Sequence, residues 1–61
     1  MESLIKTEYN GDVYSIYKIS ELYELSVLKN NATFGQKIGL YGTLKLAWDE
    51  IYKRIETEEN Q

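Results

Sequence analysis

LIKTEYNGDVYSIY, residues 4–17, is the stretch of sequence that decides the fold. Asn10-Gly11 lies in it between two runs rich in β-branched and aromatic residues. An Asn-Gly pair supplies the two positive φ angles of a type I′ turn, whose twist matches that of the strands it joins. The stretch therefore predicts a β-hairpin that pairs Glu8 with Val13, Thr7 with Tyr14, Lys6 with Ser15, Ile5 with Ile16 and Leu4 with Tyr17.

The segment after the hairpin has the features of a short helix. Ser20 is a favourable N-cap residue, and Glu21 and Glu24 would lie in the first turn, where the helix dipole stabilises carboxylates. Leucine then recurs at every third position, at Leu22, Leu25 and Leu28. We therefore expect a helix over residues 21–29, ended by the two asparagines at 30–31.

The C-terminal part of the chain predicts a longer amphipathic helix over residues 44–57, with Thr43 as its N-cap. Apolar residues recur there at spacings of three and four, the pattern of a helix with one buried face: Leu44, Ala47, Trp48, Ile51, Tyr52 and Ile55. Opposite charges four residues apart, such as Lys45 with Asp49 and Glu50 with Arg54, support its exposed face.

Residues 30–42 contain three glycines, Gly35, Gly39 and Gly42, and predict an irregular connection with at most a helical turn over 33–38. The expected fold class is thus α+β: a small single domain with an N-terminal β-hairpin, a short helix, a glycine-containing connection and a longer C-terminal amphipathic helix. The domain would cover residues 1–55. Residues 56–61 would form an acidic tail that frays, because acidic residues oppose the dipole at a helix C-terminus.

Composition argues against catalysis. The 61 residues include neither histidine nor cysteine, so disulfides and thiolate metal sites are excluded. The carboxylates are explained by a helix first turn and by a charged helix face, and adjacent Asp49 and Glu50 diverge around a helix. We expect no enzymatic activity, no catalytic or metal-binding residue and no cofactor.

Small size and tyrosine content point to a protein partner. A domain of this length is marginally stable alone, and a subunit interface is the common support that remains without disulfides or a metal, so a homodimer is expected. The six tyrosines suit half-buried surfaces, although sheet formation and the rim of a core would account for most of them. The aromatic residues predicted to contact a partner or a second copy are Tyr14, Tyr17, Tyr41, Trp48 and Tyr52.

A nucleic-acid-binding regulator is the alternative, because no acidic residue lies between Leu25 and Trp48. The residues that would contact nucleic acid are Lys29, Gln36, Lys37 and Lys45. Three lysines are a thin electrostatic footprint, and the formal net charge is -3, so a protein partner is preferred. A structural or assembly subunit is the third alternative.

The N-terminus shows no signal-peptide pattern and no apolar run spans a membrane, so a cytoplasmic location is expected, in a cell or in an infected host. The hairpin segment followed by Ser20-Glu21-Leu22-Tyr23-Glu24-Leu25 resembles the start of phage antirepressor proteins, which open with a hairpin and then a helix. The central Arg and His of that helix are absent here. The resemblance implies an origin in a mobile element, and the protein would then modulate or inhibit a host protein.

Overall fold

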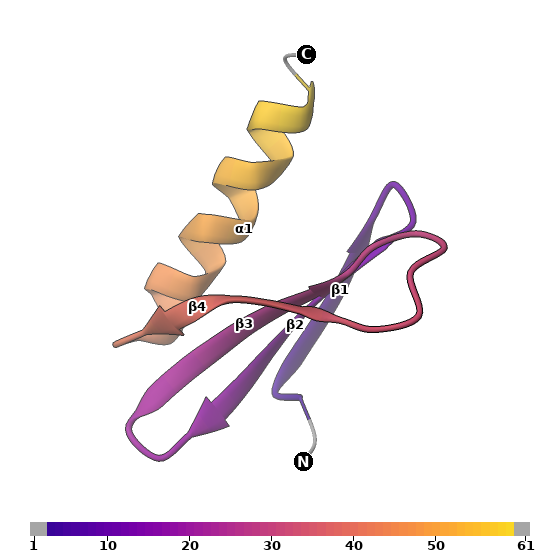
Figure 1. The fold of residues 1–61 in the computed structure, drawn as a ribbon. Helices are drawn as coiled ribbons and strands as arrows, with labels where there is room; N and C mark the ends of the chain where they lie inside the picture. Colours follow the sequence, from indigo (N-terminus) through magenta and orange to yellow (C-terminus); the bar gives the residue numbers. More distant parts are fainter. Residues whose placement is uncertain (1–2, 60–61) are drawn as a thin grey trace.

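The computed structural model describes residues 3–59 of the chain, with side chains through residue 57. It consists of four antiparallel strands in sequential order and one C-terminal helix (Figure 1). The elements are β1 (Ile5–Tyr9), β2 (Asp12–Ile19), β3 (Leu22–Leu28), β4 (Gln36–Tyr41) and α1 (Leu44–Glu59). Each strand is joined to the next by a turn or loop, so every strand pairing is between sequence neighbours.

The first hairpin has the predicted register. Thr7 lies opposite Tyr14, and the pairs on either side follow in step from Ile5↔Ile16 to Tyr9↔Asp12. Asn10 and Gly11 have φ angles of 53° and 85°, as a type I′ turn requires. Local turn chemistry and strand propensity therefore account for this part of the fold.

The expected helix over residues 21–29 is wrong, and with it the predicted order of elements, although the fold is still broadly α+β. This segment is strand β3, paired along its length with β2. Ser20 is not an N-cap. It has a φ of 57° and is the first of two turn residues between the paired Ile19 and Leu22, as in a type II′ turn. The strand places Tyr23, Leu25 and Val27 on one face and the residues between them on the other. The hairpin-then-helix arrangement implied by the antirepressor resemblance is therefore absent here.

The connection expected over residues 30–42 also contains a strand. The Lys29 carbonyl accepts a hydrogen bond of 2.9 Å from the Ala32 amide, and Asn31 has a φ of 71°, so the chain turns back there and forms β4. The register between β3 and β4 shifts by one residue: Leu25 lies opposite Gly39, but Ser26 lies opposite Lys37. Ile38 is therefore the extra residue of a β-bulge.

Helix α1 forms where the apolar periodicity predicts it. The Leu46 amide donates a 3.2 Å hydrogen bond to the Thr43 hydroxyl, which confirms Thr43 as the N-cap. The ion pairs Lys45–Asp49 and Glu50–Arg54 form, each at 3.1 Å. The helix continues to Glu59, so most of the acidic segment expected to fray is helical; residues 60–61 lie outside the described part.

The core lies between one face of the sheet and α1, which makes its main contacts with β3 and β4. Its fully buried side chains come from β2, β3 and the helix: Tyr14, Ile16, Leu25, Val27, Ala47 and Ile51. We call this face of the sheet the core face. Within residues 3–59, no helix has the length and apolar character needed to cross a membrane.

Candidate binding surface

Within residues 3–59 no helix covers the opposite face of the sheet, and we call it the open face. Side chains alternate between the two faces along each strand, so the strand register decides which residues it carries. Its central row crosses all four strands: Lys6 is opposite Ser15, Ser15 opposite Ser26, and Ser26 opposite Lys37. The row thus has small hydroxyl side chains at its centre and a cation at each edge.

A hollow of about 300 Å³ lies over this row. The two serines form part of its floor, and Lys6, Tyr17, Leu28 and Phe34 contribute to its lining. Short serine side chains between longer neighbours explain why the surface is depressed here. The hollow combines apolar walls with hydroxyl groups and one cation.

Several large apolar side chains of this part of the molecule are exposed to solvent, and two of them, Leu28 and Phe34, line the hollow. Phe34, in the loop between β3 and β4, is 84% exposed. The others come from strand ends and from the segment before β1: Leu4, Leu22, Leu28 and Leu40. Scattered exposed leucines are ordinary, but an almost fully exposed aromatic ring beside a hollow makes this surface a candidate for binding.

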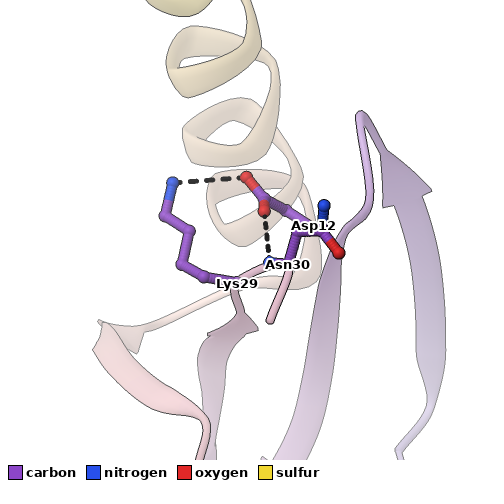
Figure 2. Close-up of polar contacts among 3 residues, drawn as sticks. All are labelled: Asp12, Lys29 and Asn30. Carbon is purple, nitrogen blue, oxygen red and sulfur yellow. Dashed lines mark hydrogen bonds and ion pairs between the residues drawn. The ribbon is translucent and has the colours of Figure 1, made fainter. Parts of the chain in front are cut away.

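Asp12 contacts the start of the loop that carries Phe34. Its carboxylate accepts a 2.8 Å hydrogen bond from the Asn30 backbone amide and lies 3.3 Å from the Lys29 ammonium (Figure 2). These contacts connect the turn after β1 to the start of the loop after β3, which lie at the same end of the sheet (Figure 1). The Asn30 amide lowers the pKa of Asp12 below its ordinary value of 3.8, and Lys29 lowers it further against the opposing effect of burial.

The Asp12 contacts should give the protein a pH-dependent stability. Because the pKa is lower in the folded chain, the stabilisation is complete above the ordinary value of 3.8 and is lost as pH falls through the folded value. Asp12→Asn should therefore unfold at a lower denaturant concentration than wild type at pH 7. The gap between the two unfolding midpoints should narrow below about pH 4.

Urea unfolding at a series of pH values measures that gap. Glu21→Gln, which removes the same charge from an exposed turn, is the matched control and should show no comparable gap. A difference between wild type and Asp12→Asn that stays constant between pH 7 and pH 2 would contradict the assignment.

The five predicted aromatic contacts occupy four separate places. Tyr14 is 2% exposed in the core, so its side chain is not available at the surface of this chain. Tyr17 lines the hollow on the open face. Tyr41 packs against the core and over Gly39, where its hydroxyl lies 3.3 Å from the position that a Cβ atom would take. Burial raises the pKa of Tyr41, and the charge of Glu50 raises it further. Trp48 and Tyr52 stack on α1 with ring centroids 5.7 Å apart.

The four predicted nucleic-acid contacts are not brought together into one site. Lys29 pairs with Asp12, Lys37 lies 3.8 Å from Glu24, and Lys45 pairs with Asp49 on the helix. Gln36 is exposed at the start of β4. The stretch that lacks acidic residues in sequence is therefore not free of them in space.

Sequence reasoning missed Leu22, Leu28, Phe34 and Leu40 as surface residues. The alternation of Leu22, Glu24, Ser26 and Leu28 with Tyr23, Leu25 and Val27 was the available signal for the first two, because it separates two faces of a strand.

No group of three or more residues able to hold a metal ion occurs within the described part of the chain.

Comparison with known proteins gives no relative on which to base a function. No protein-family model matches the chain, and neither curated proteins nor solved structures contain a significant match.

Proposed function

We propose that the chain is a non-enzymatic protein-binding module that contacts its partner with the open face, around the hollow. The observation that carries this proposal is the exposure of Phe34 at the rim of the hollow. Aromatic side chains that fill a pocket or present one are the usual anchors of protein interfaces. The Asp12 contacts hold the start of the Phe34 loop in place, which lowers the entropy lost on binding.

The charges of the open face favour a protein over a polyanion. Lys6 and Lys37 are matched on this face by Glu8 and Glu24, and Glu24 lies within ion-pair distance of Lys37. Nucleic-acid surfaces instead gather unpaired cations that displace counterions from phosphates. A balanced polar rim around apolar contacts is the composition of protein interfaces.

A direct test compares two aspartate variants in a binding assay. Phe34→Asp places a charge at the rim of the hollow, whereas Tyr52→Asp places the same charge at an exposed aromatic residue of α1. Each protein is immobilised and exposed to lysate from the cells that make it. Recovered proteins are identified and their affinity is then measured with purified components.

The proposal expects a partner that binds wild type and Tyr52→Asp equally and loses at least ten-fold in affinity for Phe34→Asp, since interface anchors contribute about 2 kcal/mol or more. Circular dichroism must show that both variants fold. Equal affinity for Phe34→Asp and wild type would overturn the proposal, as would loss of binding with Tyr52→Asp alone.

The nucleic-acid alternative stays a prediction and has its own assay. The assay is a mobility shift with single- and double-stranded probes at about 50 mM salt, because electrostatic binding is strong at low salt. A shift that Lys37→Gln weakens would support that alternative over a protein partner. Association into large assemblies, observed by light scattering, would support the structural-subunit alternative.

A further inference from the structure

Strand β1 is an edge of the sheet, and its outer side is unpaired within residues 3–59 (Figure 1). In a two-residue hairpin the pair that flanks the turn, here Tyr9 and Asp12, is hydrogen-bonded. Hydrogen-bonded and non-hydrogen-bonded pairs then alternate along the hairpin. Thr7 therefore directs its backbone groups to β2, while Lys6 and Glu8 direct theirs outward, ready to pair with another strand.

We propose that a second copy of this chain pairs with this edge, β1 against β1 and antiparallel, about a two-fold axis at Thr7. The sequence of β1, Ile5-Lys6-Thr7-Glu8-Tyr9, is self-complementary in this register. Lys6 lies opposite Glu8 of the second copy, and Glu8 opposite its Lys6, both on the open face. Ile5 lies opposite Tyr9 of the second copy on the core face, so each charge meets its opposite and each apolar residue meets another.

Charge selects this register over its neighbours. Outward-facing backbone groups must meet outward-facing groups, so the registers nearest to it differ by two residues. One of them places Lys6 opposite Lys6, and the other places Glu8 opposite Glu8. Like charges directly opposite each other destabilise a strand pair, so of these three registers only the one centred on Thr7 is free of repulsion.

Charged residues on an edge strand usually prevent pairing. Lys6 and Glu8 differ from that pattern because they have opposite signs, lie two residues apart and are exposed. The other edge, β4, is interrupted by its bulge, which disfavours an added strand. The dimer would join the two open faces into one surface with a hollow on each side. It shares Lys6 with the lining of the hollow, so self-association and partner binding through Phe34 are measured in separate assays.

Charge inversion tests the register. Lys6→Glu (K6E) and Glu8→Lys (E8K) each replace attraction by repulsion, and we expect each to weaken self-association roughly ten-fold or more. The double variant K6E/E8K restores opposite charges and should dimerise like wild type. Sedimentation equilibrium from about 10 µM to 1 mM covers the affinities of small interfaces.

Recovery in the double variant separates pairing from a general effect of mutation on folding, which circular dichroism checks in each protein. A wild-type chain that is monomeric across the whole range would overturn the proposal. Dimerisation that neither single variant weakens, or that the double variant does not recover, would do the same.

A cross-link gives an independent readout at the two-fold axis. The two copies of Thr7 would form a non-hydrogen-bonded pair with Cα atoms about 4.5 Å apart, within the range that a disulfide spans. The chain has no cysteine, so Thr7→Cys introduces a single thiol. Thr57→Cys, an exposed site on α1, is the matched control.

Thr7→Cys should form a disulfide-linked dimer under mild oxidation much faster than Thr57→Cys, and adding K6E to Thr7→Cys should slow it. Equal rates at the two positions would overturn the proposed axis even if the chain dimerises by another surface. Partner capture by Phe34 is measured separately, so failure of one proposal leaves the other open to its own test.

Discussion

Replacing Ile51 with alanine is expected to lower the free energy of unfolding by about 3 kcal/mol. The Ile51 side chain is 1% exposed and lies in the cluster that joins α1 to β2 and β3. Its loss removes buried apolar surface and leaves a cavity that the surrounding sheet fills only in part. A domain of this length has a total stability of roughly 3–9 kcal/mol, so the substitution should remove a third of that stability or more.

Leu46→Ala is the matched control for this prediction. Leu46 lies on the same helix but is 51% exposed, and alanine favours a helix at either position. Urea unfolding should place Leu46→Ala within about 0.5 kcal/mol of wild type. Equal destabilisation by the two substitutions would mean that the helix does not dock on the sheet through Ile51.

The elements that the sequence predicts correctly are those with a local cause. Asn10 and Gly11 need positive φ angles for their turn, and few residue pairs other than Asn-Gly adopt them readily. The helix over α1 is similarly specified by its Thr43 cap, by ion pairs within the helix and by a long apolar stripe. In each, the residues that decide the structure are close together in the chain.

The sequence of strand β3 predicts a helix because its local signals fit both structures. Ser20 and Glu21 are good residues for a helix N-terminus, yet they form a tight turn in which Ser20 has a positive φ. Alternating side chains were visible from Tyr23 to Leu28, but they became decisive only through pairing with β2 on one side and β4 on the other. Tertiary contacts overrode a weak helical preference.

The candidate site was less predictable than the fold because its features depend on non-local pairing. Lys29 and Lys37 are free of acidic neighbours in sequence but meet Asp12 and Glu24 once the sheet forms. The hollow exists because two serines from different strands, Ser15 and Ser26, lie side by side. Phe34 could be marked as aromatic from the sequence, but its exposure follows from the path of a loop that no local pattern specifies.

The second large effect is expected for two leucine variants of strand β3. Leu25→Ala should cost about 2–5 kcal/mol, whereas Leu22→Ala should cost less than about 1 kcal/mol. In a helix, residues three apart lie on one face, so the two leucines would be buried or exposed together. In a strand they lie on opposite faces, and the structure has Leu25 at 0% exposure and Leu22 at 41%.

The pair of leucine variants therefore distinguishes strand from helix without a new structure. Both changes remove the same atoms from the same element, so differences in side-chain chemistry cancel. Urea unfolding followed by circular dichroism gives the two free energies, and Val27→Ala provides a further value for the core face, where a buried side chain should again be costly. Similar losses from Leu22→Ala and Leu25→Ala would contradict the strand, because a two-residue alternation in burial is the property that separates β3 from the helix its sequence suggests.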